Sequence, residues 1–212
     1  MAKGRATTLC LLLIAGCGSP GGNGAGDAVI GGGPDLASAP NPVLSYGHEV
    51  GQVMPDFTAA GYRLSPAETD SARLTWDPGI ELYEYRADPS CKCLLITVCA
   101  LWCTACQREQ AQLVTDVSRD PSFCVLAIVQ DGPVKQVMAT RQDVDAWTQR
   151  YSQNFSVVQG TPSTEMLLSG GSGSAVGLPL GFVLDPATMK VLDVVEGFVT
   201  SIHDDAVALC EP

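Results

Sequence analysis

The chain has 212 residues, of which 46% are hydrophobic and 17% are charged, so it is long enough for one domain of ordinary size and too apolar to be disordered throughout. Its formal net charge is −11. A protein that binds nucleic acid through phosphate contacts needs a basic surface, so we expect no nucleic-acid partner.

The first residues are typical of an export signal. Lys3 and Arg5 precede an apolar run over 9–15, which is too short to span a bilayer and has the proportions of a signal-peptide core. The run ends in Leu-Ile-Ala-Gly directly before Cys17, and this pattern resembles the bacterial lipobox, in which the cysteine is acylated. An ordinary secretory signal or a buried helix is the alternative. We predict a lipoprotein signal peptide over 1–16 and a lipid anchor on Cys17.

The segment over 17–45 consists mainly of glycine, proline, serine, alanine and asparagine. It holds too little apolar surface to offset the entropy of ordering, so we predict a flexible, glycine-rich tether. Residues 46–212 are predicted to form one α/β domain.

The first part of this domain gives few clear signals. Residues 54–58 are typical of the start of an edge strand, with Pro55 at its entrance. The stretch over 61–90 is ambiguous: the run 77–79 (Asp-Pro-Gly) favours a turn, and residues 82–85 fit either a helical turn or a strand.

The rest of the domain is more regular. The continuous apolar run over 94–99 predicts a strand that is buried on both faces. Later apolar periodicities and turn residues predict a helix over 107–119, a buried strand over 123–129, a helix over 134–151, a short strand over 155–158, a helix over 161–168 capped by Thr161, a flexible loop over 169–174, an antiparallel hairpin over 181–184 and 190–195, and a final helix over 202–209.

Two cysteines three positions apart, Cys103 and Cys106, lie between the predicted buried strand and the helix that follows it. At a helix N-terminus the free backbone N–H groups and the helix dipole favour a thiolate, so we assign Cys103 as the nucleophile. Cys106 lies one turn later, where it is placed to resolve a mixed disulfide, and Trp102 would cover one side of the pair.

Zinc binding and a structural disulfide are the alternatives for this pair. Zinc requires two further ligands, and the remaining candidates are His48, His203 and the pair Cys91 and Cys93. The position between strand and helix favours redox chemistry. We therefore predict neither a metal nor a cofactor.

With this motif, residues 94–109 resemble the thioredoxin superfamily, and within it the TlpA-like exported thiol–disulfide oxidoreductases; the likeness extends loosely from residue 53 to 197. The resemblance implies a thioredoxin-like α/β fold with a mixed central sheet flanked by helices. It also implies that Glu109 tunes the cysteine pair as a candidate proton acceptor, although a solvated helix glutamate is the alternative. Thioredoxins proper carry a buried aspartate six residues before the first cysteine, where this chain has Thr97, so the exported type is favoured.

The resemblance further implies a cis peptide bond at Leu178–Pro179, next to the cysteines. Trp102, Leu178 and Pro179 would then contact the substrate, with the backbone of Leu178 pairing with an incoming chain. Families of this kind often carry threonine or valine before the proline, so leucine leaves the partner preference open.

Five further cysteines remain, and an odd number leaves at least one unpaired within the chain. Cys99 lies in the predicted buried strand and is interpreted as a core residue. Cys124 begins a parallel neighbouring strand, which favours a disulfide with Cys91 or Cys93, while Cys210 competes for the same partner.

The sequence thus predicts a lipid-anchored enzyme of the cell envelope, facing the periplasm. Its partners would be thiols and disulfides of exported proteins, with electrons supplied by a membrane-bound thiol donor. Two alternatives stay open. A thiol peroxidase is suggested by the Pro55-Asp56-Phe57 opening, and a copper-handling chaperone by the cysteine pair with His203 in the last helix.

Overall fold

The computed structural model describes residues 45–64, 75–169 and 177–211. The predicted signal peptide, Cys17, nearly all of the predicted tether and most of the predicted loop at 169–174 lie outside these residues. In chain order the elements are β1 (Thr58–Tyr62), β2 (Trp76–Glu81), the 3-10 helix η2 (Leu82–Ala87), β3 (Cys93–Ala100), α1 (Thr104–Arg119), β4 (Phe123–Asp131), α2 (Arg141–Tyr151), β5 (Ser156–Gln159), α3 (Pro162–Ser169), β6 (Leu180–Asp185), β7 (Lys190–Glu196) and α4 (Ile202–Cys210).

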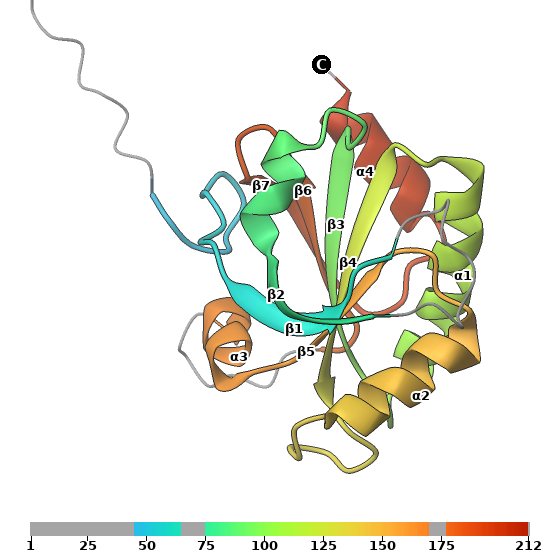
Figure 1. Ribbon diagram of the computed structural model, residues 1–212. Helices are drawn as coiled ribbons and strands as arrows, with labels where there is room; N and C mark the ends of the chain where they lie inside the picture. The colour runs from blue at the N-terminus through green and yellow to red at the C-terminus, as the bar shows by residue number, and fades with distance from the viewer. Residues whose placement is uncertain (1–44, 65–74, 170–176, 212) are drawn as a thin grey trace, which may run out of the picture. The chain divides into compact units, whose positions relative to one another are not determined.

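The described strands form a seven-stranded sheet in the order β2-β1-β5-β4-β3-β6-β7 (Figure 1). β3, β4 and β5 are parallel to one another, whereas β1, β2, β6 and β7 pair with their neighbours in antiparallel fashion. The predicted mixed sheet with flanking helices is therefore confirmed. The carboxyl ends of β3 and β4 lie at the same edge of the sheet, and this edge positions the site described below.

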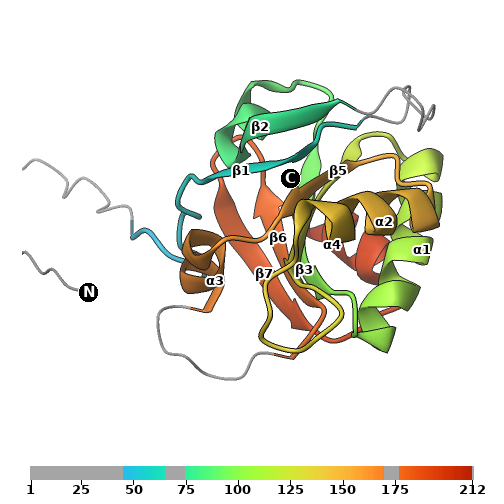
Figure 2. The same cartoon turned by 60° about the horizontal axis from the view of Figure 1, so that its bottom comes forward.

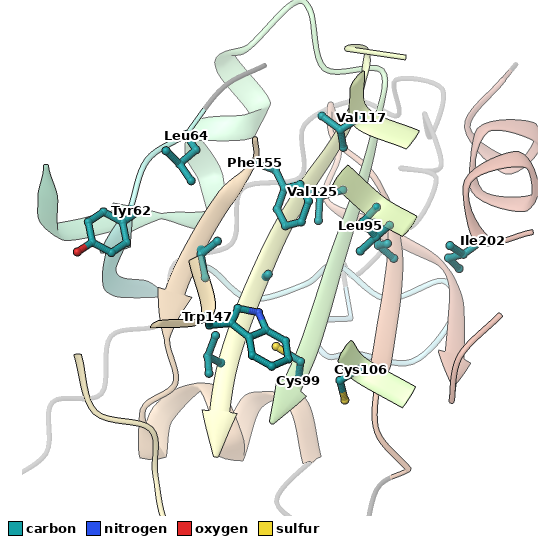
Figure 3. Close-up of a cluster of buried hydrophobic side chains, with 14 of the residues drawn as sticks. Tyr62, Leu64, Leu95, Cys99, Cys106, Val117, Val125, Trp147, Phe155 and Ile202 are labelled. Carbon is teal, nitrogen blue, oxygen red and sulfur yellow. The ribbon is translucent and has the colours of Figure 1, made fainter. Parts of the chain in front are cut away.

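β3 lies inside the sheet, and all eight of its residues are buried. Because successive side chains of a strand point to opposite faces, Leu95 and Cys99 pack with α1, α2 and α4, while Leu94 and Ile96 belong to a second cluster on the other face. Figure 2 shows α1, α2 and α4 together on one side of the sheet. Figure 3 shows side chains of these helices against the strands, among them Val117, Trp147 and Ile202.

The predicted turn at 77–79 is wrong, because these residues lie within β2. Ala59 of β1 pairs with Ile80, whereas Gly61 pairs with Asp77, so two residues of β2 oppose one residue of β1. Such a bulge accommodates Pro-Gly without breaking the ladder, and β2 is the edge strand, where a proline removes no needed hydrogen bond.

The prediction of an edge strand that begins within 54–58 is also wrong, both in where the strand begins and in its position in the sheet. β1 begins at Thr58 and lies between β2 and β5. The residues before it contact the hairpin instead: Met54 donates its backbone N–H to the carbonyl oxygen of Met189 over 2.8 Å.

The predicted helix over 134–151 is wrong in its first part, because α2 begins only after Thr140. Thr140 and Asp143 form a capping box: the Asp143 backbone N–H donates to the Thr140 hydroxyl over 3.3 Å, and the Thr140 backbone N–H donates to the Asp143 carboxylate over 2.8 Å. Val134, at which the predicted helix began, and Val137, which belongs to its apolar periodicity, are 60% and 53% exposed in the loop before the helix.

The other predicted helices, strands and hairpin are confirmed, with small shifts at their ends, and residues 82–85 belong to η2. Among the described helices, none is both long enough and apolar enough to cross a bilayer.

Two disulfides lie at the start of β3, at the edge of the sheet opposite the carboxyl ends of β3 and β4. Cys91 is bonded to Cys124, which is one of the two pairings predicted for Cys124. Cys93 is bonded to Cys210 at the end of α4. Cys99 is the free cysteine among the described residues, and it is fully buried.

Candidate active site

Cys103 and Cys106 lie at the junction of β3 and α1 and are joined by a disulfide, with their Cα atoms 5.2 Å apart. Cys103 is the N-cap residue of α1: its N–H donates to the carbonyl oxygen of Ala100 over 3.0 Å, and its own carbonyl oxygen accepts the N–H of Gln107 over 3.1 Å. The end of a buried strand and the first turn of a helix therefore hold the pair in place.

The surroundings of Cys103 favour a negative charge on its sulfur. The backbone N–H of Cys106 donates to Cys103 Sγ over 3.1 Å, and the first turn of α1 contains no acidic residue. Free N–H groups and the positive end of the helix dipole stabilise an anion at this position. Cys103 is 5% exposed and Cys106 is fully buried, so Cys103 is the sulfur that another molecule reaches first.

Trp102 is held by the last residue of β4 and by the loop that follows it. Its indole N–H donates to Oδ2 of Asp131 over 3.1 Å, and the same oxygen accepts the backbone N–H of Gln136 over 3.0 Å. The ammonium group of Lys135 lies 4.6 Å from the centre of the indole ring. Sequence reasoning missed Asp131 and Lys135. The signal that points to them is their position at the carboxyl end of β4, beside the end of β3.

Glu109 lies on the buried side of α1, and the alternative of a solvated helix glutamate is wrong. Its side chain is 4% exposed and accepts a hydrogen bond from the Thr97 hydroxyl over 2.6 Å. Burial raises the pKa of the Glu109 carboxyl from 4.5 to about 7, and the hydrogen bond from Thr97 opposes part of this rise. Thr97, which the sequence marked only as a departure from thioredoxins, is thus the partner of this carboxyl.

The free Cys99 belongs to the same buried region as Glu109. Burial raises the pKa of the Cys99 thiol well above its ordinary value, and the nearby carboxyl of Glu109 adds to the rise. Cys99 therefore stays a protonated thiol at neutral pH, in keeping with its interpretation as a core residue.

The Leu178–Pro179 peptide bond is cis. It directly precedes β6, whose first residue, Leu180, pairs with Val98 near the carboxyl end of β3. The topology therefore brings this dipeptide to the same edge of the sheet as Cys103. The carbonyl oxygen of Pro179 accepts the N–H of Gly197 over 2.7 Å.

His203, a ligand candidate in the zinc and copper alternatives, lies elsewhere. Its ring packs against Phe123, the first residue of β4, and contacts the carboxylates of Asp120 and Asp204 over 3.3 and 2.7 Å. It therefore lies at the edge of the sheet opposite Cys103. Within the described ranges, no three histidine, cysteine or acidic side chains are grouped as a metal site requires.

No family model and no curated protein sequence matches this chain. Its structure is similar to that of a protein described as the thiol:disulfide interchange protein DsbE of Chlorobium tepidum, with 18% identity, a TM-score of 0.55, and 77% of this chain and 99% of the other covered. A thiol:disulfide interchange protein from Bacteroides sp. gives 15% identity, a TM-score of 0.53, and coverage of 76% and 89%. The chain has a thioredoxin-like fold.

A 2-Cys peroxiredoxin of Plasmodium vivax is also similar, with 13% identity, a TM-score of 0.53, and coverage of 76% of this chain and 95% of the other. The thioredoxin-like fold thus occurs in neighbours whose names state two different activities. At such identities the likeness establishes the fold alone, and the activity has to be argued from the residues of the site.

Proposed function

We propose that this protein is an exported thiol–disulfide oxidoreductase that reduces disulfides of other exported proteins through Cys103 and Cys106. The observation that carries the proposal is the position of the pair: Cys103 caps the N-terminus of α1 and accepts the N–H of Cys106, with the buried Cys106 one turn behind it. This arrangement supplies a stabilised thiolate and a second thiol within reach of it.

In the reduced enzyme, the Cys103 thiolate attacks one sulfur of a substrate disulfide. A bond forms between Cys103 Sγ and that sulfur, and the other substrate cysteine leaves as a thiolate and takes up a proton. The Cys106 thiol then loses its proton and attacks Cys103 Sγ. This second step closes the Cys103–Cys106 disulfide and releases the first substrate sulfur as a thiol, so two electrons pass from the enzyme to the substrate.

Glu109 is the proposed acceptor of the Cys106 proton. It lies three positions after Cys106, so the two side chains share one face of α1, and both are buried. A carboxyl with a pKa of about 7 is partly ionised at neutral pH, so it can accept a proton in one step and release it in another. We assign Trp102, Leu178 and Pro179 to contacts with the substrate chain.

The direction and the location belong to the same proposal. A membrane-bound thiol donor would return the pair to the dithiol, and the lipid on Cys17 would hold the domain at the membrane, facing the periplasm. A Cys17→Ala variant is then expected to move from the membrane fraction to the soluble fraction. A dithiol–disulfide potential well above about −200 mV would instead indicate an oxidase.

The test of the reaction is reduction of insulin by the dithiol form. The Cys103→Ser variant is expected to lose at least about 100-fold in rate, because it lacks the attacking thiolate. A variant with both Cys91→Ser and Cys124→Ser is the matched control, since it also lacks one disulfide but at the opposite edge of the sheet, and we expect it to remain active. Equal rates for the wild type and Cys103→Ser would contradict the proposal.

Hydrogen peroxide distinguishes the thiol peroxidase alternative, whose support is the likeness in fold to a peroxiredoxin. Under the proposal, the dithiol form of the wild type reduces insulin. It consumes hydrogen peroxide, however, no faster than the Cys103→Ser variant does. Rapid, Cys103-dependent consumption of peroxide would favour the alternative.

A further inference from the structure

The loop between β4 and α2, residues 132–139, has a fixed conformation. The N–H of Gly132 donates to the carbonyl oxygen of Val137 over 2.8 Å, and the N–H of Val137 donates to that of Val134 over 3.2 Å. At the end of the loop, the N–H of Ala139 donates to the carbonyl oxygen of Gln130 over 2.9 Å. These bonds, together with the Asp131 carboxylate that binds Gln136, hold the loop as a short return at the end of β4.

This loop presents apolar side chains to solvent. Val134 and Val137 are 60% and 53% exposed, and they are two of the five large hydrophobic side chains that stand out among the described residues. Because the surrounding backbone is hydrogen-bonded, their exposure is built into the loop. Exposed apolar groups held in a fixed position beside a reactive site are typical of a surface that another molecule covers.

The loop adjoins the cysteine pair. The N–H of Leu101 donates to the carbonyl oxygen of Asp131 over 3.1 Å, and the Asp131 carboxylate binds the indole N–H of Trp102, the residue before Cys103. Lys135, at the centre of the loop, stacks its ammonium group on the Trp102 ring. Val134 and Val137 are the exposed apolar residues on either side of Lys135 in this loop, and we name Val134, Lys135, Val137 and Trp102 together the loop face.

The loop after β4 and the first part of α1 each carry a cation. The chain carries a net charge of −11, yet the loop face carries the cation of Lys135, and Arg108 of α1 stacks on Phe198 with 5.5 Å between the guanidinium and the ring centre. Stacking on a ring leaves the charge of a cation in place. Asp131, the last residue of β4, keeps its negative charge while its Oδ2 atom accepts hydrogen bonds from Trp102 and Gln136, and Lys135 is the charged residue of the loop itself.

We infer that the loop face selects substrates in which an apolar and an acidic side chain flank the cysteine under attack. The occupant is an extended segment of a protein substrate: its apolar side chain covers Val134 and Val137, and its carboxylate pairs with Lys135. The inference rests on the proposed function and adds the substrate class to it. Lys135, Val134 and Val137 are then specificity-determining residues.

The test uses disulfide-linked fluorogenic peptides that differ only beside the cysteine: valine with aspartate, valine with lysine, and serine with aspartate. For the wild type at low salt, kcat/KM is expected to be at least about 10-fold higher for the valine–aspartate peptide than for the valine–lysine peptide, mostly through KM, and the ratio should fall at high salt. Lys135→Glu should reverse this preference.

The valine pair is tested separately. A variant with both Val134→Ser and Val137→Ser should lose about 3- to 10-fold in kcat/KM for the valine–aspartate peptide and little for the serine–aspartate peptide. Lys190→Glu is the control for net charge, because Lys190 is exposed at the start of β7, at the opposite edge of the sheet. Equal rates for the three peptides, or an equal effect of Lys190→Glu and Lys135→Glu, would overturn the inference.

Binding separates this inference from the proposed function. The Cys103→Ser chain and labelled peptides with serine in place of cysteine allow binding to be measured by fluorescence anisotropy without any reaction. Tighter binding of the valine–aspartate peptide, lost in Lys135→Glu, supports the loop face even if no peptide is reduced. Equal affinity for all peptides overturns it even if insulin is reduced.

Discussion

The cysteines at the two ends of β3 differ in the kind of disulfide that they form. Beyond its carboxyl end, Cys103 and Cys106 are bonded over a separation of 3 residues, with Cys103 5% exposed and Cys106 fully buried. At its start, Cys91–Cys124 and Cys93–Cys210 connect residues 33 and 117 positions apart. A disulfide that closes a long loop removes far more entropy from the unfolded chain than one within a single helical turn. The comparison teaches that one edge can change its redox state with little effect on the fold, whereas the other edge stabilises the fold.

The largest expected effect comes from opening the long-range disulfide. A variant with both Cys93→Ser and Cys210→Ser should lose about 5 kcal/mol of unfolding free energy in urea, because its loop of 117 residues is no longer closed in the unfolded state. Insulin reduction should persist under native conditions. The pair Cys91→Ser with Cys124→Ser should lose about 4 kcal/mol, for a loop of 33 residues. Equal stability of either variant and the wild type would remove the contrast between the edges.

The next effect is a pH dependence that belongs to the Cys103 edge. The pKa of Glu109 is raised to about 7 in the folded protein, so the folded state binds this proton more tightly than the unfolded state. Its contribution to stability is therefore present at low pH and is lost as the pH rises from about 4.5 through 7. A full shift of this size corresponds to about 3 kcal/mol.

Glu109→Gln replaces the titrating carboxyl by a neutral amide, so the variant does not lose stability by this route as the pH rises. Its unfolding free energy relative to that of the wild type should therefore be up to about 3 kcal/mol higher at pH 9 than at pH 5. Urea denaturation of the oxidised proteins at both pH values measures the difference. Glu165→Gln, at an exposed position of α3, is the control and should show almost no pH-dependent gain. If the unfolding free energies of the wild type and Glu109→Gln changed with pH in parallel, burial would not raise the pKa of Glu109.

A smaller effect should follow from the hydroxyl that contacts Glu109. Thr97→Val removes the hydrogen bond that favours the ionised carboxyl, so the pKa of Glu109 should rise further and stability should fall by about 1 kcal/mol at pH 8. Thr97→Ser keeps the hydroxyl and should stay close to the wild type. A second measurement compares the wild type, Thr97→Val and Thr97→Ser by the pH at which Cys103 of the dithiol form becomes reactive toward iodoacetamide.

The smallest effect concerns the contact of Lys135 with Trp102. Lys135→Gln should lower the unfolding free energy by about 0.5–1 kcal/mol, the range for a cation–aromatic contact at the protein surface, because Lys135 itself is exposed. The same substitution in a Trp102→Leu background should cost less, and this double-mutant cycle isolates the contact. A cycle that closes with no coupling would show that Lys135 acts on substrates alone.

Much of this arrangement was predictable from the sequence, because strong local signals agree with the tertiary structure. The apolar run of β3, the cysteine pair before α1 and the hairpin of β6 and β7 each define an element without ambiguity. The prediction failed where the sequence held two local signals that favour different structures. Pro78 and Gly79 indicate a turn, yet an edge strand with a bulge accepts the same residues.

The failure before α2 is similar. Val137 and Met138 continue the apolar spacing of the helix toward the N-terminus. The capping box of Thr140 and Asp143 marks where the helix begins, however, and this second signal was present in the sequence. The burial of Glu109 and its contact with Thr97 could not be predicted from periodicity, because they depend on how α1 packs on β3. The part played by Asp131 depends in the same way on the pairing of β3 with β4.

The disulfide between Cys93 and Cys210 also has a consequence for biosynthesis. Cys93 is made 117 residues before its partner, whereas both Cys91 and Cys124 are made well before Cys210. A nascent chain therefore holds Cys93 without its partner, beside cysteines that offer wrong partners, until Cys210 has been made. A chain that terminates before residue 210 keeps that thiol unpaired, so the presence of this bond identifies molecules whose synthesis reached the end of α4.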